Sequence, residues 1–194
     1  MNSADGNTGS VRERLLAAAD ELFYGEGVQS VGVERIVRRA GASKKSLYAV
    51  FGSKEALVLA YLQARHAAIQ DRLTGGLASF QTPRERLLGV FDVQGEWFAA
   101  PGYNGCPFLS ASAEAVPGGL VEQAHADYRA WVHALFTGLA TQARIPGPAM
   151  IARQLHLLFD AAGVAAKADA DPAAAATARA AAGAILDCAV ASEY

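Results

Sequence analysis

A run of basic side chains marks one short part of this 194-residue chain. From Arg35 to Lys54 there are six basic residues and no acidic one, although the whole chain has a formal net charge of −2. Ammonium and guanidinium groups gathered at one place bind phosphate, and lysine also donates hydrogen bonds to guanine O6 and N7. The local charge therefore predicts a polyanionic partner. The alternative is an ordinary solvated helix surface.

The stretch GASKKSLYAVFGSKEAL, residues 41–57, combines these cations with apolar residues at helical spacing. Ser43 is the expected N-cap of a short helix, and Leu47 and Phe51 should face the protein interior. The outward residues of this helix are then Lys44, Lys45, Tyr48 and Ala49. A preceding helix, VERIVRRAG, is separated from it by the four-residue link AGAS. Two short helices so joined predict a helix-turn-helix, whose second helix enters the major groove of DNA.

The outward residues have the chemistry that this placement requires. Lysine can donate to guanine or to phosphate, the Tyr48 hydroxyl suits a phosphate oxygen, and Ala49 can touch a thymine methyl group. Lys54 begins the next helix, where free backbone N–H groups also favour phosphate. Double-stranded DNA is therefore the predicted partner of this surface.

The rest of the chain predicts helices and almost no strands, so we expect an all-α fold of about nine helices. Capping boxes begin helices after Ser10 and Thr82, and Pro and Gly separate the later helices. The later helices are expected at roughly 107–116, 120–143, 148–168 and 172–191. We expect a disordered leader at residues 1–9, a helix-turn-helix DNA-binding domain at 10–52, and an effector-binding and dimerisation domain at 53–194.

Composition and spacing argue against several other classes of protein. No apolar run of 18 residues and no secretory signal pattern were identified, so we expect no membrane partner and a cytoplasmic location. Two distant cysteines predict a reducing compartment. The four histidines lack the spacing of a metal site, and no phosphate-binding loop or nucleophile elbow is present, so neither cofactor nor catalytic residue is predicted.

The first third of the chain closely resembles the DNA-binding head of the TetR family of bacterial transcriptional regulators. The matching segments are LLAAADELFYGEG and VERIVRRAGASKKSLYAVFGSKEALVLAYL, within about residues 10–62. The resemblance implies base-facing roles for Lys44, Lys45, Ser46 and Ala49. It implies phosphate-facing roles for Ser43, Tyr48 and Lys54. Lys45 is a departure, because the family often has Gly at this position.

Residues 66–194 resemble the family less sharply, although GCPFLSASAE at 105–114 is similar to a segment of one subgroup. The resemblance implies an all-helical domain with a ligand cavity, and a dimer interface made by the last two helices. Aromatic residues concentrated between 91 and 136 are either plain core or pocket lining. The predicted ligand contacts are Gln94, Trp97, Tyr103, Asn104, Phe108, Trp131 and His133. The predicted dimer contacts are Leu155, Leu158, Phe159, Ile185 and Leu186.

The leading hypothesis is a homodimeric repressor that an unknown small molecule releases from an inverted-repeat operator. An all-helical enzyme is a second hypothesis, and a redox-sensing regulator that uses Cys106 is a variant of the first. A head that binds protein instead of DNA is a third hypothesis, which would predict weak salt dependence of any DNA binding.

Overall fold

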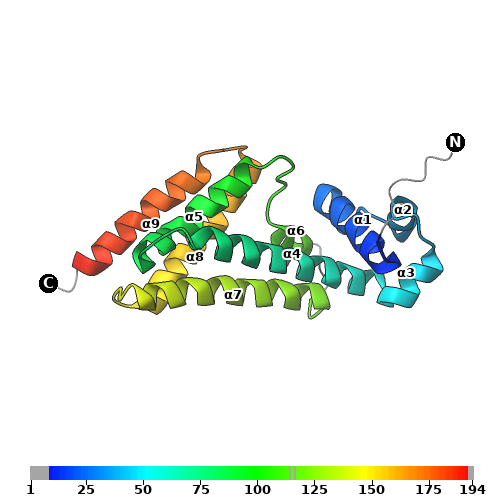
Figure 1. Cartoon of the computed structure of the whole chain (residues 1–194), viewed down its shortest axis with the longest axis horizontal. Helices are drawn as coiled ribbons and strands as arrows, with labels where there is room; N and C mark the ends of the chain where they lie inside the picture. The colour runs from blue at the N-terminus through cyan, green and yellow to red at the C-terminus, as the bar shows by residue number, and fades with distance from the viewer. Residues whose placement is uncertain (1–8, 114, 116, 192–194) are drawn as a thin grey trace. The chain divides into compact units, whose positions relative to one another are not determined.

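The structure is a computed structural model, and it describes residues 9–113, 115 and 117–191. Within these residues the chain forms nine α-helices and no strand, which confirms the predicted all-α fold (Figure 1). The helices are α1 (Val11–Glu26), α2 (Val33–Arg39), α3 (Lys44–Phe51), α4 (Lys54–Leu77), α5 (Pro83–Ala99), α6 (Pro107–Ala113), α7 (Leu120–Gln142), α8 (Pro148–Ala168) and α9 (Ala174–Ala191).

Local sequence sets where several of these helices begin. The Ser10 side chain accepts a hydrogen bond from the Glu13 backbone, and the Glu13 carboxylate accepts one from the Ser10 backbone at 2.7 Å. Thr82 and Glu85 form the same reciprocal pair at the start of α5, with Pro83 in the first turn. Both predicted capping boxes are present. Each satisfies backbone N–H groups that the first turn of a helix leaves without partners.

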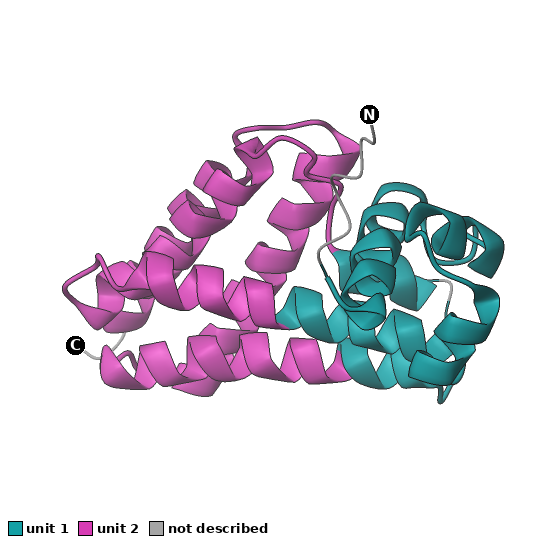
Figure 2. Cartoon of the chain, turned by 45° about the vertical axis from the view of Figure 1, so that its right-hand side comes forward, with its two compact units in different colours: residues 1–66, 107–125 teal, residues 67–106, 126–194 magenta. Residues whose placement is uncertain are grey.

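The helical residues divide into two compact units, coloured separately in Figure 2. The first unit comprises residues 1–66 and 107–125, of which residues 1–8, 114 and 116 are not described. Its core includes apolar side chains of α1, α2 and α3, and the fully buried ones include Leu15, Ile36 and Leu47. Arg65 of α4 holds Asp20 of α1 through a 2.5 Å contact from Nε to Oδ1.

The second unit comprises residues 67–106 and 126–194, with 192–194 not described. In it α5, α8 and α9 pack against one another. Phe91, Phe136, Leu155 and Leu186 are fully buried in its core. On its surface Arg179 of α9 pairs with Asp92 of α5 at 2.9 Å. Helices α4 and α7 contribute residues to both units.

The observed boundaries differ in part from those expected. The compact units divide within α4, after His66, whereas the predicted domain boundary lay at residue 53. Tyr61 and Arg65 of α4 contact Phe23 and Asp20 of α1. Helix α6 ends at Ala113 instead of 116, and α9 begins at Ala174 instead of 172. Except for Gly9, the predicted leader lies outside the described residues.

Helix α9 is long and apolar enough to cross a membrane by length and composition alone. Core helices of soluble proteins pass the same test, so this feature is weak support for a membrane span. In this chain 28% of the α9 window is buried, because one face packs on α5 and α8. The opposite face is rich in small apolar residues and remains uncovered within one chain.

Candidate nucleic-acid interface

The turn between α2 and α3 is fixed by backbone conformation and by one serine. Gly41 has a φ of +57°, a left-handed conformation that glycine adopts without a steric penalty. Ser43 caps α3 by accepting a hydrogen bond from the Ser46 backbone N–H at 3.0 Å. Gly52 then ends α3 with a φ of +79°. The short helix therefore begins and ends where the sequence predicted.

Helix α3 has a buried side and an exposed side. The Leu47 side chain is fully buried, and the half-buried Phe51 ring lies 5.5 Å from the Arg12 guanidinium. Lys44, Lys45 and Ala49 are exposed on the other side, and Tyr48 is 49% exposed. Packing at Leu47 thus holds a set of basic and polar side chains towards solvent.

Three acidic residues pair with the cations of this surface, which the sequence reasoning missed. Ion pairs join Lys44 to Glu34, Arg39 to Glu21 and Arg35 to Glu26. The hydrogen bond from Lys44 lowers the pKa of the Glu34 carboxyl group, and the same contact raises the pKa of the Lys44 ammonium. A window starting at Arg35 excluded all three glutamates. Their proximity depends on how α1, α2 and α3 pack.

Two cations of the same basic run differ from the others because they have no polar partner among the described residues. Lys45 and Arg38 are both exposed, and neither has a hydrogen-bond or ion-pair partner among the described residues. Lys45 lies on the outer side of α3, one helical turn before Ala49. The Lys45 ammonium can therefore bind an anion without first breaking an ion pair with another described residue.

The predicted phosphate contacts are also engaged within the chain. The Ser43 and Ser46 hydroxyl oxygens lie 2.8 Å apart, and Ser46 is half-buried. The Lys54 ammonium donates to the Val28 carbonyl at 2.7 Å and lies 5.9 Å from the Phe23 ring centroid. The Lys54 contact ties α4 to the segment that follows α1.

Among the predicted ligand contacts, the structure brings Gln94, Trp97 and Tyr103 together. Gln94 and Trp97 line a cavity of about 10 Å³ with Val93 and Phe159, among other residues. That volume holds about one water molecule. The Tyr103 ring packs edge-on against Trp97 at 5.4 Å, and its hydroxyl donates to the Gly163 carbonyl at 3.1 Å.

Gln94 is the most constrained member of this group. Its side chain is 4% exposed, and its Nε2 donates to the Phe159 carbonyl at 2.8 Å. Its Oε1 is buried with no hydrogen-bond partner in the part of the chain that the structure describes. A buried acceptor left without a donor costs about 1–3 kcal/mol, and such groups often mark functional positions.

The other predicted ligand residues lie elsewhere. Phe108 belongs to the first unit, where it is buried against the His66 ring at 6.0 Å, and it is not among the residues that line the Gln94 cavity. Asn104 accepts a hydrogen bond from Lys167. Trp131 packs on Tyr128 at 6.4 Å, and His133 stacks on His156 at 6.3 Å. The aromatic-rich segment therefore supplies both plain core and cavity lining.

The predicted dimer contacts differ in how far they are buried within the single chain. Leu155, Phe159 and Leu186 are buried in the core of the single chain, with exposures of 0, 5 and 0%, so they have no free surface for a partner. Leu158 and Ile185 are half-buried. The sequence pattern did not distinguish the inner from the outer face of these alanine-rich helices. Burial within one chain makes that distinction.

Two short helices joined by a tight turn, the second with cationic and aromatic side chains facing solvent, place this chain in the class of helix-turn-helix proteins. Residues 15–61 match the family model of bacterial regulatory proteins of the tetR family. A TetR-family transcriptional regulator from Streptomyces coelicolor is 31% identical, with a TM-score of 0.86 over 92% of this chain and 95% of that chain. The chain belongs to the TetR family.

A second comparison identifies a named relative. The transcriptional repressor NemR of Escherichia coli K12 is 34% identical over 105 residues, which are 53% of each protein. This match thus spans about half the length of NemR. The crystal structure of reduced NemR has a TM-score of 0.79 and 28% identity, covering 89% of this chain and 94% of that one. Both relatives are transcriptional regulators.

Proposed function

We propose that this protein is a cytoplasmic transcriptional repressor that binds double-stranded DNA through α3 and is released by a small molecule. The outer side of α3 carries this proposal: Lys45 has no partner among the described residues, Tyr48 is half exposed, and Leu47 anchors both from beneath. The head would comprise residues 10–52, with the start of α4 adding Lys54. Membership of the TetR family supports DNA as the polyanion.

The exposed residues divide into two proposed roles. Lys45 and Ala49 read base edges in the major groove, and Lys44 joins them by exchanging Glu34 for DNA. Tyr48, Ser43 and Lys54 contact phosphates and set the position of the helix. Ser46 has a smaller share than the sequence predicted, because its hydroxyl is already paired with Ser43.

Selection of bound duplexes from a random pool, at two salt concentrations, tests the proposal. An enriched inverted repeat is expected, with affinity falling steeply as salt rises, at about −0.9 in log–log slope for each phosphate contact. Folded protein that enriches no sequence would reject sequence-specific DNA binding. The position of the recovered sequence relative to a promoter, tested with a reporter, then distinguishes repression from activation.

A homodimer would place two α3 helices on the two half-sites of such a repeat. The proposed interface uses exposed apolar residues of α8 that recur every seven positions and therefore share one face. They are Met150, Leu157 and Val164, with exposures of 58, 67 and 48%. Ile185 of α9 lines a surface pocket together with Met150, while half-buried Leu158 and the 42%-exposed Val190 are further apolar residues of these two helices. Leu157→Glu combined with Val164→Glu should give monomers in light scattering, whereas an unchanged mass would place the interface elsewhere.

The proposed effector site is the cavity at Gln94, Trp97 and Tyr103. Its support is the buried Oε1 of Gln94, which offers an acceptor to a ligand that carries a hydrogen-bond donor. Since the cavity holds only about one water molecule, a larger effector must displace half-buried Trp97 or its neighbours. Coupling to DNA would be a shift in the population of dimer conformations, with α4 as the connecting helix.

A redox response through Cys106 is a second candidate. Cys106 is half-buried and forms no disulfide with the other cysteine, Cys188, which is exposed. The aliphatic part of the Lys167 side chain lies against Gly105, the residue before Cys106, and its ammonium donates to Asn104, two residues before the thiol. An ammonium close to a cysteine favours its thiolate form. Oxidant that releases wild-type and Cys188→Ser protein from DNA, but not Cys106→Ser, would support this candidate over the cavity.

A further inference from the structure

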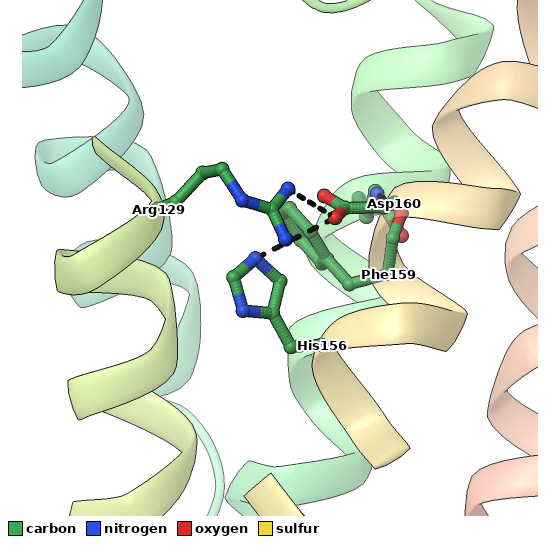
Figure 3. Close-up of polar contacts among 5 residues, drawn as sticks. Arg129, His156, Phe159 and Asp160 are labelled. Atoms are coloured by element: carbon green, nitrogen blue, oxygen red, sulfur yellow. Dashed lines mark hydrogen bonds and ion pairs between the residues drawn. The ribbon is translucent and has the colours of Figure 1, made fainter. Parts of the chain in front are cut away.

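A groove on the surface of the second unit lies between α7 and α8 and is lined mainly by basic side chains. Arg129, His133, Arg153, His156 and Leu157 surround a volume of about 250 Å³. Figure 3 shows Arg129 of α7 facing His156 and Asp160 of α8. This groove shares no lining residue with the proposed effector cavity. One of its residues, His133, was among the ligand contacts predicted from the sequence.

The charges around the groove favour an anion. No carboxylate lines it among the described residues. The nearest acidic group, Asp160, accepts from the Arg129 guanidinium at 2.5 Å, which holds that guanidinium in place (Figure 3). Arg153 is exposed and has no hydrogen-bond or ion-pair partner within the described part of the chain. Its five donors remain available to a ligand.

His156 provides an independent observation at the same place. The residue is 7% exposed, and its Nε2 has no hydrogen-bond partner among the described residues. The nearest acceptor, Asp160 Oδ2, is 3.6 Å away, beyond ordinary hydrogen-bond distance. Burial lowers the pKa of His156, and the positive charge of Arg129 and the neighbouring His133 act in the same direction, against Asp160. A buried imidazole nitrogen beside the groove therefore has no hydrogen-bond partner of its own among the described residues, and a ligand could supply one.

We propose that this groove binds a small organic anion, whose carboxylate or phosphate group contacts the guanidinium groups of Arg129 and Arg153. Arginine suits this role because its planar fork matches the two oxygens of either group. The imidazoles of His133 and His156 supply further N–H donors. The inference concerns anion binding alone and does not depend on the DNA-binding role.

Calorimetric titration of the full-length protein, without DNA, tests the inference with three probes. Inorganic phosphate and benzoate represent the two anion classes, and benzamide is the uncharged counterpart of benzoate. We expect phosphate or benzoate to bind and benzamide not to bind, and the stronger anion identifies the class. Equal binding of benzoate and benzamide, or no binding of either anion, would overturn the proposal.

Substitutions then locate the bound anion. Arg153→Gln removes an exposed side chain and should preserve the fold, while weakening anion binding by roughly tenfold or more, as expected for a charge-assisted hydrogen bond. Arg179→Gln is the matched control, because Arg179 lies in the same unit but pairs with Asp92 away from the groove. Circular dichroism checks that both variants are folded. Equal weakening by the two substitutions would contradict the assigned site.

Discussion

The binding sites proposed for the two units of this protein use polar side chains in different ways. In the first unit, cations of α2 and α3 lie on the surface, and Arg35, Arg39 and Lys44 each have a carboxylate partner. In the second unit, Gln94 and His156 are buried, and each has one polar atom without a hydrogen-bond partner among the described residues.

This difference follows from the size of the proposed partners. A nucleic acid presents many phosphates over a broad surface, so exposed cations on a rigid helix suffice, and internal ion pairs cost little to exchange in water. A small ligand offers few contacts, and each must be strong. Unsatisfied polar groups in a dry interior provide such contacts, at a cost in stability when the site is empty.

The largest expected effect is on the scaffold beneath the proposed DNA-binding surface. Leu47→Ala removes a fully buried side chain and should lower the free energy of unfolding by about 2–5 kcal/mol. Tyr48→Ala, one residue further along α3 and half exposed, should change it much less. Urea denaturation measures both. Similar losses in the two variants would contradict the division of α3 into a packed side and a binding side.

Next in size is the division between base reading and phosphate contact. Lys45→Ala should remove about 1–3 kcal/mol of discrimination between the preferred and a substituted half-site, because one base contact is lost. Tyr48→Phe should weaken binding to both duplexes alike. Fluorescence anisotropy with the two duplexes measures the ratio. The same change of ratio in both variants would reject the assigned roles.

The buried histidine predicts how stability depends on pH. Its pKa is lowered in the folded state, so the unfolded chain binds a proton more readily, and protonation favours unfolding. The stabilising contribution is complete above the unfolded pKa of about 6.5 and is lost as pH falls through the folded pKa. Thermal unfolding over this acidic range should show a steeper loss for wild type than for His156→Leu. Parallel curves would show that His156 is not responsible.

A smaller effect is expected at Gln94. Leucine has a similar size and removes both the buried acceptor without a partner and the hydrogen bond to Phe159, so Gln94→Leu should change stability by less than about 1 kcal/mol. An effector should no longer release this variant from DNA. Thermal unfolding measures the first expectation. A loss of several kcal/mol would show that Gln94 has a structural role and would weaken its assignment to a ligand site.

The smallest effect concerns the exposed ion pair between Lys44 and Glu34. Glu34→Gln removes the internal partner of Lys44, so DNA affinity should rise by roughly two- to fivefold at low salt and less at high salt. Glu13→Gln controls for net charge, because Glu13 caps α1 through Ser10 and, within the described part of the chain, does not pair with the cations of α2 and α3. Anisotropy titrations measure both. An equal gain from Glu13→Gln would mean that total charge, not release of Lys44, is responsible.

Much of the architecture was predictable because it depends on interactions close in sequence. Capping boxes at Ser10 and Thr82, the Ser43 cap and helical apolar spacing each act within a few residues. They fixed the helical class, the start of α3 and the buried position of Leu47. The resemblance of the first third to TetR regulators rests on the same local pattern, and the family comparisons confirm it.

Tertiary structure alone decided which polar groups are paired and which apolar residues are covered. Glu34 reaches Lys44 because α2 packs beside α3, and Arg129 reaches Asp160 because α7 lies beside α8. Leu155 and Leu157 are two residues apart in one helix, yet the first is fully buried and the second is 67% exposed. Sequence by itself determined the helices and the chemistry they carry. Burial and long-range pairing depend on contacts between residues far apart in the chain, and only the folded structure brings those residues together.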